Sequence, residues 1–177
     1  MNLFEINILY WIREHLTCPF LDWLMPPLSA LSAHGEIWIL LAAVLMGIPK
    51  TRRVGVTMGV TLLLGYLIGN LGLKNLIARV RPYDVVDVPL LVAHLHDFAF
   101  PSGHTLASVG AATALTLYHR RWGAAALTLA AVIGFSRLYL FVHYPTDVVA
   151  GALLGVALAF TARWLVDRLY AKKNSAP

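Results

Sequence analysis

Five apolar runs, each long enough to cross a lipid bilayer as a helix, set the main constraint on this sequence. They cover residues 28–48, 54–73, 102–118, 122–140 and 145–164. Apolar runs of this length are typical of transmembrane helices, which satisfy every backbone polar group within the segment. With 59% hydrophobic and 13% charged residues, the chain is far more apolar than soluble domains are. The sequence therefore predicts an all-α integral membrane protein, a bundle of about five transmembrane helices in a single domain over residues 1–177.

The segment before these runs, residues 1–27, does not have the pattern of a further span. Within it, the apolar residues of the stretch 2–15 fall near one helical face, whereas Glu5, Arg13 and Glu14 lie away from the centre of that face. This pattern is typical of an amphipathic helix that lies in the membrane interface. The prolines that follow predict an irregular segment or a second shallow helix.

The first apolar run, residues 28–48, is less regular than the other four. His34, Gly35 and Glu36 interrupt it with polar groups and a flexible position. Two interpretations remain open: one continuous span, or two short helices that meet at Gly35.

Basic residues between the runs indicate how the helices cross the membrane. They form three clusters: Lys50, Arg52 and Arg53; Arg120 and Arg121; and Arg168, Lys172 and Lys173. Five alternating spans place all three clusters on one side, which the positive-inside rule makes the cytoplasmic side. The net charge of +5 is thus explained by topology and does not indicate a nucleic-acid partner. The loops 75–101 and 137–144 are then expected to face outward.

Residues with the chemistry of phosphate binding concentrate in and beside these two outward loops. Lys74 and Arg81 are seven residues apart, so on a helix both side chains would project from one face, and Pro82 would end that helix. The same pattern is compatible with two cations that extend from a membrane boundary toward water.

The tetrapeptide Pro101, Ser102, Gly103 and His104 predicts the start of a helix. Ser102 can cap the helix, and Gly103 allows backbone N–H groups to approach an anion at the positive end of the helix dipole. His104 would then lie in the first turn, beside a bound anion. A capped helix without a ligand is the alternative.

The third group contains Arg137, His143 and Asp147. Asp147 follows His143 by four residues, with Pro145 between them at the expected start of a helix. This spacing allows the carboxylate to accept a hydrogen bond from one imidazole nitrogen, which leaves the other nitrogen free as a nucleophile or base. A structural His–Asp pair that ties a loop to a helix is the alternative.

Together these segments resemble the three-part signature of the type 2 phosphatidic acid phosphatase superfamily. Lys74-x6-Arg81-Pro82, Pro101-Ser102-Gly103-His104 and Ser136-Arg137-x5-His143-x3-Asp147 are similar to it in order and spacing. The resemblance implies a helical bundle with a phosphatase site that needs neither a metal nor another cofactor.

The resemblance also implies a role for each matching residue. The expected phosphate-binding groups are Lys74, Arg81, Ser102, Gly103 and Arg137. His143, held by Asp147, would attack phosphorus to form a phosphohistidine. His104 would protonate the departing oxygen and then deprotonate the water that hydrolyses the intermediate.

The implied substrate is a lipid phosphate or pyrophosphate, among membrane lipids at the outer face of a bacterial cytoplasmic membrane. Hydrolysis of undecaprenyl diphosphate to undecaprenyl phosphate and inorganic phosphate is the leading interpretation, by analogy with small enzymes that recycle carrier lipids. Phosphatidylglycerophosphate and phosphatidic acid are alternatives within the same resemblance. A lipid transporter or flippase is an alternative from another class, because charges within a membrane also mark translocation paths.

Two further features lie outside the signature. His94 and His96 suggest a metal site, but two closely spaced imidazoles without a nearby cysteine favour a loop that covers or selects the headgroup. Arg79 either adds charge for a second phosphate or extends to the membrane boundary.

Overall fold

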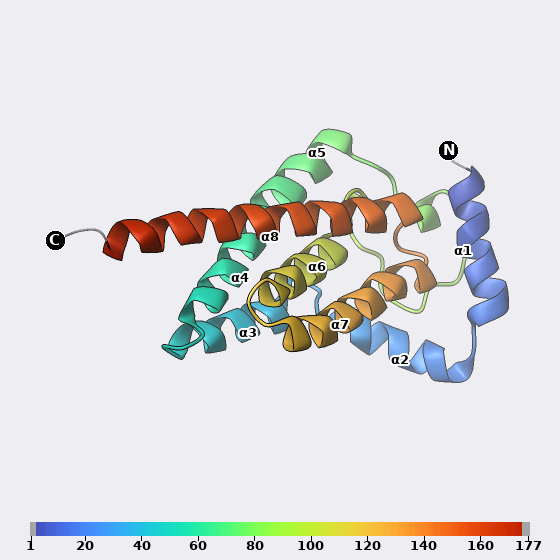
Figure 1. The fold of residues 1–177 in the computed structure, drawn as a ribbon. Helices are drawn as coiled ribbons and strands as arrows, with labels where there is room; N and C mark the ends of the chain where they lie inside the picture. Colours follow the sequence, from blue (N-terminus) through green and yellow to red (C-terminus); the bar gives the residue numbers. More distant parts are fainter. Residues whose placement is uncertain (1–2, 175–177) are drawn as a thin grey trace.

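The structure, a computed structural model, describes residues 3–174, with side chains for residues 3–172, and every regular element in this part is helical (Figure 1). The elements are α1 (Leu3–Leu16), α2 (Pro19–Ala30), α3 (Glu36–Gly47), α4 (Arg52–Gly65), the π-helix η1 (Tyr66–Leu73), α5 (Lys74–Ile77), the 3-10 helix η2 (Pro82–Asp84), α6 (Gly103–Thr116), α7 (Arg120–Tyr139) and α8 (Pro145–Asn174). Residues 1–2 and 175–177 of the predicted domain lie outside the described part, and so does the first residue of the predicted interfacial helix. The all-α prediction is confirmed for the part described.

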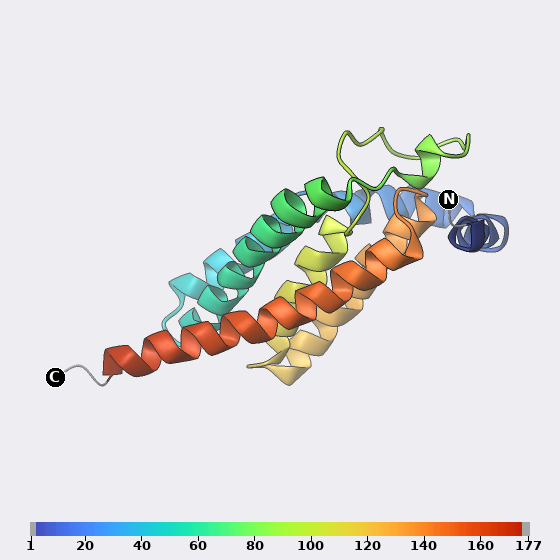
Figure 2. The same ribbon diagram turned by 90° about the horizontal axis from the view of Figure 1, so that it is seen from above.

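Helix α6 forms the centre of the bundle, and α4, α7 and α8 pack around it (Figures 1 and 2). Small side chains allow this close packing, since Ala111, Ala112 and Ala114 of α6 are fully buried. Gly155 of α8 lies so near α6 that a Cβ atom there would sit 2.7 Å from the carbonyl oxygen of Leu106. The two helices α6 and α8 therefore pack by close approach of their backbones and not by interdigitation of large side chains.

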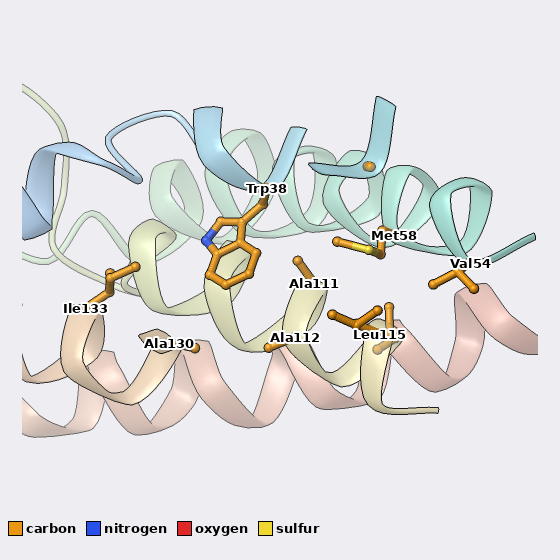
Figure 3. Close-up of a cluster of buried hydrophobic side chains, with 11 residues drawn as sticks. Trp38, Val54, Met58, Ala111, Ala112, Leu115, Ala130 and Ile133 are labelled. Atoms are coloured by element: carbon orange, nitrogen blue, oxygen red, sulfur yellow. The ribbon is translucent and has the colours of Figure 1, made fainter. Parts of the chain in front are cut away.

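A tryptophan fills the opposite side of α6. Trp38 of α3 is buried beside Met58 of α4 and Ala111 of α6, as Figure 3 shows. Its indole N–H donates a 2.8 Å hydrogen bond to Ser108 Oγ, so the polar edge of the ring is satisfied inside the core. The contact fixes α3 against α4 and against α6, which carries Gly103 and His104 at its start.

Helices α4, η1 and α5 follow one another without a break and form one rod over residues 52–77. Lys74 comes directly after the π-helical segment, a conformation frequently found at functional sites. The rod ends because Ala78 adopts a left-handed backbone with φ of 47°. The prediction that Lys74 and Arg81 share one helical face is therefore wrong. Arg81 has φ of −74° and ψ of 155°, the extended conformation that the following Pro82 favours.

Among residues 3–174, three mainly helical stretches are long and apolar enough to cross a membrane: residues 52–84, Arg120–Tyr139 and 145–172. They overlap three of the five predicted runs, 54–73, 122–140 and 145–164, and support a multi-pass membrane protein. The run 102–118 corresponds to α6, whose 14 residues give a length of about 21 Å, below the roughly 30 Å of a hydrocarbon core. The exact number of crossings stays a prediction.

The irregular run 28–48 is not one continuous helix, because it contains the last three residues of α2, a connection and all of α3. Helix α2 ends at Ala30 and α3 begins at Glu36. Gly35 caps α3 with a left-handed φ of 80°, a conformation that glycine adopts without strain. One continuous span is therefore wrong. The helices are separated by residues 31–35, and the break ends at Gly35 without the two helices meeting there.

Helix α1 exists where a helix was expected, but one of its polar residues is placed differently. Ile6, Leu9 and Ile12 are buried against the rest of the protein, and Glu5 is buried with them at 3% exposure. The prediction that Glu5 lies away from the centre of the apolar face is therefore wrong, because Glu5 is buried on that side with Arg79 and Thr146 as partners. The location of α1 in a membrane interface stays a prediction.

The two ends of the bundle differ in character. Helix α1, the connection before α6 and the connection between α7 and α8 gather at one end, here called the site end (Figures 1 and 2). At the other end the start of α4 meets the second half of α8, where Arg53 pairs with Asp167 at 2.7 Å. The predicted basic clusters lie toward this second end, at the start of α4, the start of α7 and the end of α8.

Candidate active site

The predicted site residues come from four parts of the chain and meet at the site end. Six of the eight line one cavity of about 790 Å³, and these are Lys74, Arg81, Gly103, His104, Arg137 and His143. Lys74 begins α5, Gly103 and His104 begin α6, Arg137 lies in the last turn of α7, and the other two lie in connecting segments. Ser102 and Asp147 are fully buried behind the cavity wall. The fold thus gathers three cations and two imidazoles around one space.

A carboxylate that the signature does not contain lies between two of the cations. Asp97, in the connection before α6, forms ion pairs with Lys74 and, at 2.6 Å, with Arg81. Arg81 also donates hydrogen bonds to the carbonyl oxygens of Asp97 at 2.9 Å and Val142 at 2.7 Å. Burial raises the pKa of Asp97, but the hydrogen bonds and charges of Lys74 and Arg81 outweigh it and lower that pKa to about 2. Asp97 is therefore an internal anion in the place where a phosphate would be expected.

The third cation, Arg137, is 3% exposed and far less well paired. Its guanidinium donates to the hydroxyl of Ser29 in α2, and its Nε has no hydrogen-bond partner among the described residues. A buried guanidinium with an unused donor is costly unless a ligand completes its contacts. Arg137 is thus well suited to bind an anion that enters the cavity.

The start of α6 has the geometry that its sequence predicts. Ser102 is the N-cap, and its Oγ accepts a 3.4 Å hydrogen bond from the backbone N–H of Thr105. The same hydroxyl lies 2.9 Å from Thr105 Oγ1, so in this structure it is engaged in capping and is not turned into the cavity. At Gly103 a Cβ atom would lie 2.8 Å from Asn70 Oδ1, which explains the glycine sterically. A phosphate-binding role for Ser102 and Gly103 stays a prediction.

His143 and Asp147 lie close together, with looser geometry than expected. The imidazole is 1% exposed, and its Nδ1 is 3.4 Å from Asp147 Oδ2 without forming a hydrogen bond. Asp147 Oδ2 instead accepts a 2.9 Å hydrogen bond from the backbone N–H of Tyr144. Burial, followed by the charges of Arg81 and Arg137, lowers the pKa of His143 well below its usual range. A lowered pKa favours the neutral ring, the form in which an imidazole can act as a nucleophile.

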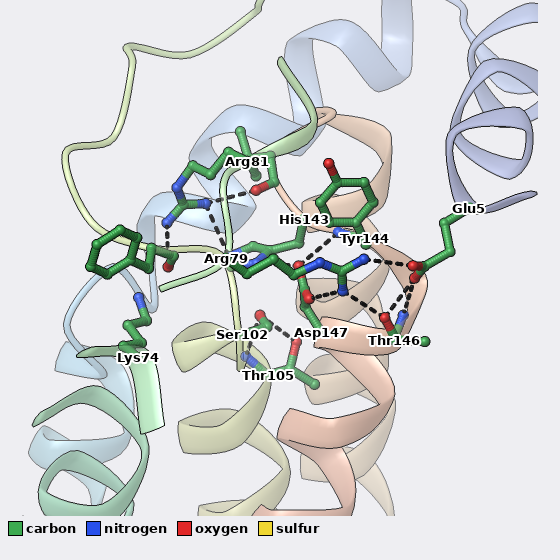
Figure 4. Close-up of polar contacts among 12 residues, drawn as sticks. Glu5, Lys74, Arg79, Arg81, Ser102, Thr105, His143, Tyr144, Thr146 and Asp147 are labelled. Atoms are coloured by element: carbon green, nitrogen blue, oxygen red, sulfur yellow. Dashed lines mark hydrogen bonds and ion pairs between the residues drawn. The ribbon is translucent and has the colours of Figure 1, made fainter. Parts of the chain in front are cut away.

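A network behind His143 contains residues that the signature does not name (Figure 4). Arg79 donates 2.6 Å hydrogen bonds to Asp147 Oδ1 and to Glu5 Oε2. Its guanidinium lies 3.8 Å from the centre of the Tyr144 ring. These contacts direct Arg79 toward two carboxylates, and it does not line the cavity that a second phosphate would occupy. Only its proximity to Arg81 in the sequence indicated a role, because nothing local reveals that Glu5 is its partner.

The two histidines of the long connection before α6 do not form a metal site with their neighbours. The ring of His94 packs edge-on against Tyr83 at 4.8 Å between centroids. Within residues 3–172, no group of three or more His, Cys, Asp or Glu side chains is arranged to hold a metal ion. Metal independence of the site itself stays a prediction.

Residues 54–171 match the PAP2 superfamily, and the chain belongs to that superfamily. Among curated relatives, an undecaprenyl-diphosphatase of Sulfolobus acidocaldarius is 34% identical over 134 residues, covering 73% of this chain and 65% of the relative. The bacitracin transport permease protein BcrC of Bacillus licheniformis is 36% identical over 108 residues, covering 60% of this chain and 51% of the relative. The chain thus spans about half to two thirds of the length of these relatives.

A solved structure extends the similarity over nearly the whole fold. It is a transmembrane PAP2 type phosphatidylglycerolphosphate phosphatase from Bacillus subtilis, with a TM-score of 0.76 and 26% sequence identity. The match covers 95% of this chain and 88% of that chain. The N-terminal helices of this protein, and not only its signature region, therefore follow an arrangement known in the superfamily.

Proposed function

We propose that this protein is a membrane phosphatase that hydrolyses a lipid phosphate or pyrophosphate at the outer face of a bacterial cytoplasmic membrane. The observation that carries the proposal is the single cavity in which Lys74, Arg81 and Arg137 meet His104 and His143. Three cations can oppose the charge that develops on the equatorial oxygens during phosphoryl transfer. Membership in the PAP2 superfamily supports the same reaction class.

In the proposed first step, Nε2 of neutral His143 attacks phosphorus in line with the bond that breaks. The electron pair of that bond leaves with the lipid oxygen, which takes a proton from His104. The product is a phosphohistidine whose ring carries positive charge. Asp147, 3.4 Å from Nδ1 in this structure, faces that charge and stabilises it.

In the second step, His104 removes a proton from water as the water attacks the phosphohistidine. The bond between phosphorus and His143 breaks, inorganic phosphate forms, and His143 returns to its neutral state. The three cations hold the transferred group in both steps, so the mechanism requires no metal. The Nε–H group of Arg137 has no hydrogen-bond partner among the described residues, so it can donate a hydrogen bond to an incoming phosphate oxygen.

The remainder of the cavity supports a substrate with a long apolar tail. Away from the cations, its lining includes apolar residues of α3 and α4, among them Ile39, Ala42, Met46, Leu62 and Leu63. Ile39 and Leu63 are also more than half exposed on the outer surface of the bundle, at 53% and 57%. A lipid tail could therefore occupy the cavity and extend toward the bilayer. Undecaprenyl diphosphate is the leading substrate, on the similarity to the Sulfolobus enzyme, and phosphatidylglycerophosphate and phosphatidic acid are the alternatives.

A lipid transporter or flippase is the competing function. The cavity has its three cations, His104 and His143 at the site end, whereas its lining along α3 and the middle of α4 is apolar. A charged headgroup has no polar route along that lining to the opposite end, and this favours hydrolysis over transport.

Release of inorganic phosphate from purified protein tests the proposal. Undecaprenyl diphosphate, phosphatidylglycerophosphate and phosphatidic acid are assayed in detergent with a chelator present, and with vanadate as an analogue of the pentacoordinate transition state. We expect turnover on at least one lipid, unaffected by the chelator and blocked by vanadate. His143→Ala is the control for contaminating phosphatase. Absence of release from all three lipids would overturn the proposed activity, and loss in chelator restored by a divalent ion would overturn metal independence.

The proposed orientation has a separate test in Cys18, the only cysteine of the chain, which is exposed between α1 and α2. This junction lies at the site end, because Asp22 of α2 accepts a 2.6 Å hydrogen bond from Tyr139 at the end of α7. A maleimide that cannot cross membranes should label Cys18 in intact cells, and Cys18→Ser is the control. Labelling only after the membrane is opened would contradict an outward-facing site.

A further inference from the structure

Glu5 of α1 is a buried carboxylate at the edge of the candidate site. Its side chain is 4% exposed, and its two oxygens accept hydrogen bonds from three groups. Oε1 accepts from the backbone N–H of Thr146 at 3.0 Å and from the Thr146 hydroxyl at 2.6 Å, while Oε2 accepts from Arg79 at 2.6 Å. Burial raises the pKa of Glu5, but the hydrogen bonds from Thr146 and Arg79 outweigh it and hold the pKa below its usual value. Glu5 is therefore ionised.

Arg79 joins this carboxylate to the one behind the proposed nucleophile. One nitrogen, Nη2, binds Glu5, and the other, Nη1, donates to Asp147 Oδ1 at 2.6 Å and to the Thr146 hydroxyl at 2.7 Å. The Tyr144 ring covers the guanidinium at 3.8 Å. Such contacts hold the planar fork of Arg79 in one orientation (Figure 4). A lysine has a single ammonium nitrogen and no such fork.

The balance of charge explains why two carboxylates surround one cation. If Arg79 had Asp147 as its only partner, its charge would largely cancel the carboxylate that faces His143. Glu5 shares that positive charge, so Asp147 keeps more of its negative charge for the imidazole, which becomes cationic when it carries the phosphoryl group. The three groups together carry a net charge of −1 behind His143.

We propose that Arg79 and Glu5 are positioning residues for the phosphatase reaction: Arg79, held by Glu5 of α1, fixes the Asp147 carboxylate behind His143. The proposal rests on the proposed function, since it concerns the rate of the same reaction. It also gives the N-terminal helix α1 a part in catalysis. Neither residue lines the cavity, so both act through Asp147 and without touching the substrate.

A double-mutant cycle with Glu5→Gln and Arg79→Gln tests this coupling. Glu5→Gln removes a charge with little change in size, whereas Arg79→Gln removes the charge and the guanidinium fork and shortens the side chain. For each variant kcat, KM and the amplitude of the phosphoenzyme burst are measured. We expect each single variant to lower kcat about tenfold or more, as loss of a partner that orients a histidine commonly does, with KM changed less than about threefold. In the Arg79→Gln background, Glu5→Gln should change kcat less than about twofold, because Glu5 acts through Arg79.

Matched controls separate positioning from general damage. Glu14→Gln alters an exposed carboxylate of the same helix, and Arg120→Gln alters an exposed arginine near the opposite end, so neither should change kcat. The burst amplitude measures the fraction of protein molecules with a site that can form the phosphoenzyme, here called competent sites. The value of kcat is expressed per competent site. If Arg79→Gln does not fold, Arg79→Lys decides the question, because it keeps the charge without the fork and should show the same loss of kcat.

Three outcomes would overturn the inference. These are wild-type kcat per site in Glu5→Gln or in the folded Arg79 variant, independent losses that multiply in the double variant, or a loss explained wholly by fewer competent sites. An active wild-type enzyme with unaffected variants refutes the positioning role alone. A wild-type protein that releases no phosphate from any lipid refutes the proposed function, and the positioning role with it.

Discussion

Removal of the Asp97 charge should make the site bind phosphate more tightly. Asp97 pairs with Lys74 and Arg81, two of the three cations that line the cavity. An incoming phosphate competes for the same two cations and must displace the carboxylate. In Asp97→Asn the asparagine side chain is neutral, so it binds Lys74 and Arg81 less strongly, and phosphate displaces it more easily.

The expected magnitude follows from the exposure of the pair. The Asp97 side chain is 54% exposed, so water screens both ion pairs and each contributes about 0.2 to 1 kcal/mol. Loss of both therefore favours the bound state by about 0.4 to 2 kcal/mol. Since about 1.4 kcal/mol corresponds to tenfold in affinity, the dissociation constant should fall about 2- to 30-fold.

Inhibition by orthophosphate and by vanadate measures this change at one fixed ionic strength. Asp87→Asn, an exposed aspartate of the same connection, is the matched control and should leave both inhibition constants unchanged. Because the pKa of Asp97 is about 2, the carboxylate is charged at every pH above that value, and the effect should be constant between about pH 5 and pH 8. Unchanged or weaker inhibition in Asp97→Asn would refute competition and would indicate that Asp97 arranges the cations for the substrate.

The remaining predictions concern the two histidines. His143→Ala should abolish turnover more completely than Asp147→Asn. The histidine substitution removes the attacking atom, whereas the aspartate substitution leaves a misoriented nucleophile. Steady-state kinetics of both variants on one substrate measures the difference. His104→Ala should slow hydrolysis of an alkyl phosphate much more than that of a nitrophenyl ester, whose leaving group needs no proton, and equal losses on both would reject the role of general acid. Burial and neighbouring cations hold the pKa of His143 low, so its neutral form persists as the pH falls, and the acidic limb of kcat/KM should lie below about pH 6.5. A limb at or above that pH, with a stable protein, would contradict a neutral buried nucleophile.

The sequence by itself was sufficient for the fold class and for most of the candidate site. Long apolar runs predict helices because a bilayer leaves the backbone few alternatives, and this local constraint survives in α4, α7 and α8. The cap at Ser102 was predictable for a similar reason, since an N-cap depends on residues within one turn. The signature residues were recognisable by their order and spacing, and the fold then placed six of them on one cavity.

Only the tertiary structure determined the positions of the charged residues whose partners lie far away in the sequence. Glu5 has the sequence pattern of a surface residue, but it is buried because Arg79, 74 positions later, is within reach only after α1 packs against the site end. Asp97 meets Lys74 and Arg81 because Ala78 ends the helical rod and the extended chain turns back over the cavity, which the helical spacing of the two cations does not reveal. A charge is buried only where an opposite charge or a donor meets it in space. Ion pairs and hydrogen bonds of this kind form only in the packed chain, and the local sequence pattern cannot specify them.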